Sequence, residues 1–144
     1  MSTGVDVFDT TIQKTINLLN DICGEFGWPE DRRFQAYKAL RSVLHEIRDR
    51  LPVTESANFA AQLPMLVRGF YYEGWKPESV PKKVHRQEFL DEIQKHFQLA
   101  VEGGAARLVN GVLRALSRHI EPGIIDAIKE ELPADLRSLL SPAA

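Results

Sequence analysis

The sequence predicts an all-α protein: a helical bundle of six to eight helices built from two tandem, pseudo-symmetric three-helix copies. Apolar residues recur at intervals of three and four residues along most of the chain, which is the period of an amphipathic helix. Prolines and glycines divide this pattern into segments of helical length. No segment alternates apolar and polar residues beside a tight-turn signal, so no β-sheet is expected.

The first copy is expected to span about residues 6–75, and its helices are separated by clear breaks. Gly27 suits the left-handed position that ends a helix, and Pro52 stops the next one. Thr54 is the expected N-cap of a third helix, which Pro64 interrupts and restarts. These breaks predict helices over residues 7–26, 29–51, 54–63 and 64–72.

A linker over residues 74–84 joins the first copy to a second copy at about residues 85–140, and the whole chain, 1–144, is expected to form a single domain. Two prolines and a glycine preclude a continuous helix in this linker. The second copy repeats the breaks of the first. Its helices are expected over residues 88–100, 105–120 and 122–132, with a short one through residue 140.

The two copies are related by an internal duplication. Ile12 corresponds to Ile93 at a shift of 81 residues, within matching Phe-x-x-x-Ile-Gln-Lys segments. Pro64 corresponds to Pro133 at a shift of 69, so the first copy carries 12 extra residues. Each copy has an apolar stripe that it cannot bury alone, so each is expected to pack against its copy or against a neighbour.

The composition is that of a soluble globular protein, with 144 residues, 44% hydrophobic and 26% charged, and a formal charge of −2. No apolar run approaches the ~20 residues that a membrane span needs, and the polar start lacks the features of a signal peptide. We therefore expect a cytoplasmic protein with no membrane contact. The single cysteine, Cys23, excludes an internal disulfide.

Two stretches of the first copy carry a family resemblance: Ala39-Leu-Arg-Ser-Val-Leu-His-Glu-Ile-Arg-Asp-Arg-Leu-Pro52, and the Gln-Leu-Pro to Gly-Trp phrase within residues 60–75. In these stretches the chain resembles the bacterial family catalogued as domain of unknown function 2267, over about residues 8–140. The resemblance implies an all-helical domain built from two related halves and found in bacterial cytoplasmic proteins. It implies no established activity and no catalytic residues.

A stripe of His85, Glu88, Glu92 and His96 is the candidate metal site of the sequence. Steps of three and four residues place the four side chains within a sector of about 80° on one helix. Imidazole and carboxylate at this spacing are able to hold a divalent metal. The stripe is expected on the flank of its helix, and no second helix with matching ligands is evident. We therefore expect a solvated surface, no metal and no cofactor.

An aromatic cluster of Tyr71, Tyr72 and Trp75, beside Arg68, is the candidate interaction patch. Phe70 precedes this cluster, and successive helical residues point about 100° apart, so Phe70, Tyr71 and Tyr72 cannot all enter one core stripe. Tyrosine, tryptophan and arginine also dominate interaction hot spots. One alternative is that Trp75 plugs the junction between the copies; the other is that it is an exposed anchor for a partner.

The remaining charges favour no specific chemistry. Basic residues between Arg32 and Arg50 are expected to pair with nearby acids, so nucleic acid is a disfavoured partner. His45 is expected to be exposed, opposite the apolar stripe of its helix. We therefore predict a protein-interaction or regulatory module with an unknown protein partner, and a homodimer is left open. The alternative is an enzyme, or a small-molecule or metal-binding domain that uses a pocket between the two helical copies.

Overall fold

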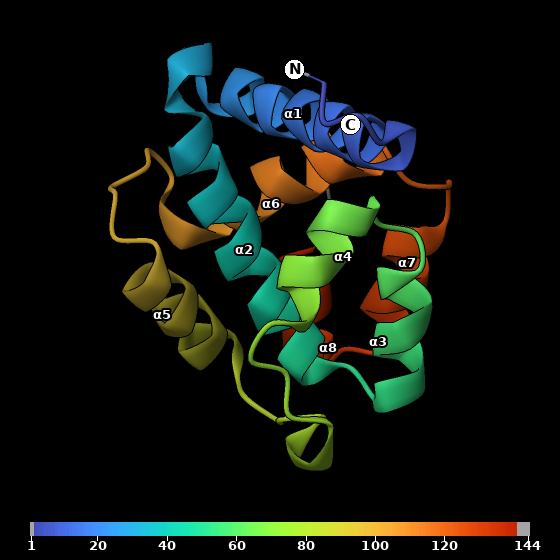
Figure 1. Cartoon of the computed structure of the whole chain (residues 1–144). Coiled ribbons are helices and arrows are strands. Elements are labelled where there is room, and N and C mark those ends of the chain that lie inside the picture. The colour runs from blue at the N-terminus through green and yellow to red at the C-terminus, as the bar shows by residue number, and fades with distance from the viewer. Residues whose placement is uncertain (1, 141–144) are drawn as a thin grey trace.

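The computed structural model describes residues 2–140 (Figure 1). These residues form helices joined by turns and loops, with no β-strand among them. The predicted all-α class is therefore confirmed. Among these residues, no helix combines the length and the apolar character that a membrane crossing requires. The α-helices are α1 (Asp6–Phe26), α2 (Arg33–Arg50), α3 (Val53–Ala60), α4 (Met65–Tyr72), α5 (Arg86–His96), α6 (Gly104–Ser117), α7 (Ile124–Glu130) and α8 (Ala134–Arg137). Short 3₁₀ turns, η1 (Glu30–Arg32) and η2 (Pro77–Ser79), precede α2 and follow α4.

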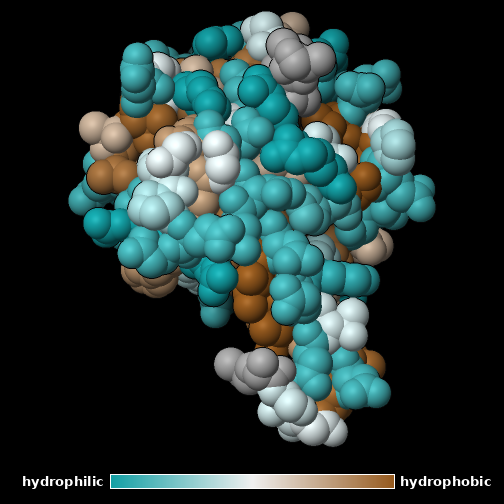
Figure 2. All heavy atoms as spheres, turned by 90° about the horizontal axis from the view of Figure 1, so that it is seen from above, coloured by the Kyte–Doolittle hydropathy of each residue, from teal (hydrophilic) through white to brown (hydrophobic). Residues whose placement is uncertain are grey.

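Helices α1, α2 and α6 form the centre of the bundle. In Figure 1, α1 lies across the top, α2 runs down from its end, and α6 lies beneath α1. Helix α5 packs against both α2 and α6, and α3 packs against α7. The outward face of α1 is mainly hydrophilic when it is viewed from above, with smaller apolar areas (Figure 2). The apolar stripe of α2 is fully buried and consists of Ala36, Ala39, Leu40, Val43, Leu44 and Ile47.

The break after α1 follows the prediction. Gly27 adopts a left-handed conformation with φ 69°, and its N–H bonds back to Gly24 O. The next amide, Trp28 N–H, donates to Cys23 O at 2.9 Å, so the last carbonyls of α1 are satisfied. The Trp28 ring stacks on Phe26 at 4.7 Å and lies 6.0 Å from the Phe97 ring. The turn after α1 therefore brings the end of α1 to the end of α5.

Several predicted helix limits are wrong: α3 ends at Ala60 and not at residue 63, and α6 ends at Ser117 and not at residue 120. Two further differences have a local cause. Thr54 is not an N-cap, because α3 already begins at Val53, with Pro52 as its cap in an extended conformation. Helix α5 ends at His96 and not at Ala100. The backbone becomes extended at Phe97, which is only 2% exposed because its ring packs into the core and toward Trp28. Tertiary packing of one aromatic ring thus overrides the helical pattern that continues past it.

The internal duplication stays a prediction, and two pairs of matching hydrogen bonds support it. Arg68 Nε donates to Ala60 O, and Arg137 Nε donates to Lys129 O, which is 69 residues further along the chain. Arg68 also donates to Leu63 O, and Arg137 donates to the corresponding Leu132 O. At this shift α2, α3 and α4 overlap in sequence with α6, α7 and α8.

Candidate ligand groove between α2 and α5

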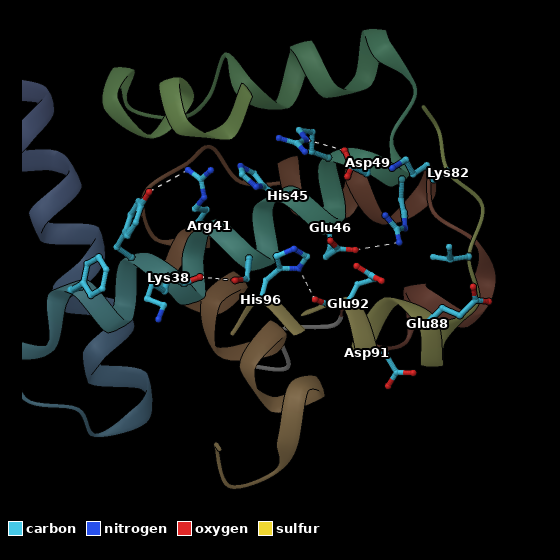
Figure 3. A pocket seen from close by; sticks show the side chains of 16 residues that line it. Lys38, Arg41, His45, Glu46, Asp49, Lys82, Glu88, Asp91, Glu92 and His96 are labelled. Carbon is cyan, nitrogen blue, oxygen red and sulfur yellow. Dashed lines mark hydrogen bonds and ion pairs between the residues drawn. The ribbon is translucent and has the colours of Figure 1, made fainter. Parts of the chain in front are cut away.

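A groove of about 820 Å³ lies between α2 and α5. It joins the two predicted copies, because α2 lies in the first and α5 in the second. Figure 3 shows charged side chains from both helices pointing into it. The lining residues that carry charge or an aromatic ring are Phe34, Tyr37, Lys38, Arg41, His45, Glu46, Arg48, Asp49, Arg50, Lys82, Glu88, Asp91, Glu92 and His96.

Arg48 is a structural residue at the wall of this groove. It is only 5% exposed, and its Nη1 donates to Tyr71 O and to Glu73 O, both at 2.8 Å. Its Nε donates to the Asp49 carboxylate at 3.0 Å. One buried guanidinium therefore satisfies two carbonyls at the end of α4, where the helix itself leaves them without partners.

Glu46 is a buried carboxylate on the groove floor. The residue is 7% exposed, and Arg50 Nη2 lies 3.2 Å from its Oε1. That oxygen nevertheless accepts no hydrogen bond from residues 2–140. Burial raises the pKa of the Glu46 carboxyl, with Arg50 acting in the opposite direction and Asp49 and Glu92 adding to the rise.

His45 is half-buried, so the expectation that it is exposed is wrong. Helix α4 packs against this side of α2, and His45 Nε2 forms a 2.7 Å hydrogen bond with Phe70 O. Because a carbonyl only accepts, Nε2 is the donor. Burial lowers the pKa of His45, and the nearby Arg48 and Arg41 act in the same direction.

We expect His45 to make the protein less stable in mild acid. The lowered pKa means that the unfolded chain binds a proton more readily than the folded chain as the pH falls below about 6.5. His45 therefore contributes stability that is present above pH 6.5 and is lost as the pH falls toward its folded pKa. Urea unfolding at pH 7.5 and pH 5.5 should show a smaller loss for His45→Gln than for the wild type. Equal losses in the two proteins would contradict this.

The groove has two ends of different character. Its basic end combines Lys38 and Arg41 with the Phe34 and Tyr37 rings. Phe34 is 71% exposed, and Lys38 Nζ lies 5.6 Å from the centroid of the Phe34 ring. The acidic end carries Glu46, Glu88, Asp91 and Glu92, beside His96, and its lining also includes two basic side chains, Lys82 and the Glu46-paired Arg50. An occupant would therefore meet opposite charges at the two ends.

Residues 16–139 match a family described as Uncharacterized conserved protein (DUF2267). The chain belongs to this family. The match includes α2 and α5, so both walls of the groove belong to the family domain. A search among curated proteins found no match. The chemistry of the groove in this DUF2267 member is therefore argued from its geometry.

The structure divides the histidine stripe predicted from sequence. His85 lies just before α5, where its Nδ1 is 3.6 Å from Asp135, and Glu88 accepts from the His85 N–H at 3.5 Å. Glu92 and His96 instead meet Glu46. From the sequence, no second helix with matching ligands is expected, whereas α2 places the Glu46 carboxylate within 4.8 Å of potential ligand atoms of Glu92 and His96. Little in the sequence indicates this placement, since Glu46 is one of two acids, with Asp49, among the basic residues from Arg32 to Arg50. The expectation that the stripe binds no metal stays a prediction.

The predicted aromatic patch is also divided in this family member. Tyr71 is fully buried, and its hydroxyl lies 2.6 Å from Ser56 Oγ. Arg68 donates to two carbonyls at the turn between α3 and α4. Tyr72 and Trp75 are half-buried, with ring centroids 5.2 Å apart. Of the four residues, Tyr72 and Trp75 retain the most freedom to contact a partner, and their recognition role stays a prediction.

Proposed function

We propose that this protein is an interaction module that holds a short segment of a partner protein in the α2–α5 groove. The length of the groove carries this proposal. Its lining follows α2 from Phe34 to Arg50, which at 1.5 Å per residue is about 24 Å. An extended segment of about seven residues has this length at ~3.3 Å per residue. A long, open groove suits such a segment better than a compact metabolite, which pockets enclose more fully.

The charges of the groove favour a segment with charges of both signs. An acidic side chain would lie at the basic end, beside Lys38 and Arg41, and a basic one at the acidic end. Such complementarity sets the direction of the segment and excludes segments with reversed charge. Phe34 adds an exposed aromatic surface for an apolar side chain.

Site-specific photocross-linking tests this proposal, with p-benzoylphenylalanine replacing either Phe34 or Phe8. Both rings are highly exposed, at 71% and 50%, and only Phe34 lines the groove. In the native lysate we expect Phe34 to capture one partner at a defined mixed-charge segment and Phe8 to capture none. Adding Asp91→Lys, which reverses an exposed charge of the groove, should reduce the yield at least fivefold, whereas Asp126→Lys on α7 should not.

Several results would contradict the proposal. These are equal capture from both positions, capture that Asp91→Lys leaves unchanged, or no captured segment at all. If cross-links form only to a second copy of the chain, the occupant of the groove is another copy of this protein and not a different partner.

A further inference from the structure

Three side chains with metal-ligand chemistry meet on the groove floor. Glu46 comes from α2, and Glu92 and His96 come from successive turns of α5. One potential ligand atom of each lies within 4.8 Å of the other two. Figure 3 shows the three side chains gathered between the two helices. The spacing of four residues on α5 keeps Glu92 and His96 on one face of the helix, so both side chains can face Glu46.

His96 is oriented as metal-binding histidines are. Its Nδ1 lies 2.9 Å from the Glu92 carbonyl oxygen. Because a carbonyl only accepts hydrogen bonds, Nδ1 carries the hydrogen, and Nε2 of the neutral ring keeps its lone pair. Metal-ligating histidines typically donate their other N–H to a carbonyl or a carboxylate in this way. This bond fixes the tautomer that leaves Nε2 able to bind a cation.

Glu46 supplies a second, independent observation. Its side chain is 9% exposed, and Oε1 accepts no hydrogen bond from residues 2–140. Arg50 is the positive charge that faces it, and the Nε of that arginine also lacks a hydrogen-bond partner among those residues. The other charged or titratable groups near Glu46 are Asp49, Glu92 and His96. The Arg50 charge offsets part of the cost of burying this carboxylate, and a metal ion would give Oε1 the direct partner that it lacks.

We propose that Glu46, Glu92 and His96 bind one divalent first-row transition-metal ion, with Zn²⁺ as the best fit. One imidazole and two carboxylates suit Zn²⁺ better than Ca²⁺ or Mg²⁺, which prefer oxygen ligands alone. Three protein ligands leave one tetrahedral position open for water or an exogenous ligand. The inference does not depend on a partner segment in the groove.

The ligand atoms need only a small closing movement to reach a metal. Atoms bound to one tetrahedral zinc at about 2.0–2.1 Å are roughly 3.4 Å apart, compared with the present limit of 4.8 Å. Glu92 is half-buried and His96 is exposed, so both side chains have room to move toward the buried Glu46. Binding would thus join α5 to α2 across the groove.

Isothermal titration of Zn²⁺ into the untagged, chelator-treated chain tests the site. We expect one ion per chain, and we expect His96→Ala to weaken binding at least tenfold. His85→Ala is the matched control, because His85 is a highly exposed histidine at the start of the same helix and lies outside the cluster. It should change the affinity less than twofold. Titration of Co²⁺ should give visible absorption bands that His96→Ala removes and His85→Ala retains.

The proposal is wrong if Zn²⁺ shows no saturable binding up to millimolar concentration, or if His96→Ala binds as the wild type does. It is also wrong if His85→Ala and His96→Ala lose affinity equally, since that would indicate scattered surface binding. Glu46→Gln provides a further test, because glutamine keeps the size of the buried side chain but removes its charge. If circular dichroism shows that this variant is folded, unchanged Zn²⁺ affinity would exclude Glu46 as a ligand.

Discussion

Arg48→Met should lower the free energy of unfolding by about 3–5 kcal/mol, the range for removing one partner of a buried charged network. Methionine fills much of the space of the arginine stem but donates no hydrogen bond. The change leaves the Tyr71 and Glu73 carbonyls and the Asp49 carboxylate without their donor. In a domain of this size the melting temperature should fall by roughly 10 °C. Urea unfolding and thermal unfolding, each followed by circular dichroism, measure the two quantities.

Arg118→Met is the matched control for this change. Arg118 also pairs with acids, but its side chain is 46% exposed, and its partners are Asp21 and Glu25 on α1. Exposed pairs of this kind contribute about 0–1 kcal/mol because water screens them. If Arg48→Met costs no more than Arg118→Met, the buried arginine does not hold α4 to α2.

The fold was predictable because its main signal is periodic and local. Residues spaced by three and four define the buried stripe of α2, and all of that stripe is in the core. Breaks at Gly27, Pro52 and Pro64 lie where the helices end or begin. The end of α5 was not predictable in this way. It depends on the contact of Phe97 with Trp28, which lies some 70 residues away in the sequence.

The site was only partly predictable, because one helix pattern does not show which other helix covers it. The sequence singled out Glu92 and His96, but Glu46 reaches them only because α2 packs on α5. The side of α2 that carries His45 looks solvent-facing by periodicity, yet α4 covers it. Polar residues that face a second layer of helices are thus misread as surface residues. The basic stretch on α2 illustrates this, since Arg48 and Arg50 are each only 5% exposed.

Tyr71→Ala should be the most damaging change within the predicted aromatic patch. Tyr71 is fully buried, and its ring meets those of Phe59 at 5.6 Å and Tyr72 at 5.3 Å. Removing a large aromatic side chain from a core costs about 3–5 kcal/mol. Tyr71→Phe should cost about 1–3 kcal/mol, since it keeps the ring and deprives the buried Ser56 hydroxyl of its 2.6 Å partner.

Trp75→Ala distinguishes the two roles considered for Trp75: a core residue that fills the junction between the copies (a plug), or a contact residue for a partner (an anchor). Trp75 is half-buried, so its loss should cost about 1–2 kcal/mol, in proportion to the apolar area it hides. A cost equal to that of Tyr71→Ala would establish Trp75 as a plug in the core. A nearly unchanged free energy of unfolding, together with loss of the partner captured at Phe34, would establish it as an anchor. Urea unfolding of both variants, read beside the cross-linking yield, decides between these outcomes because burial changes stability and recognition changes capture.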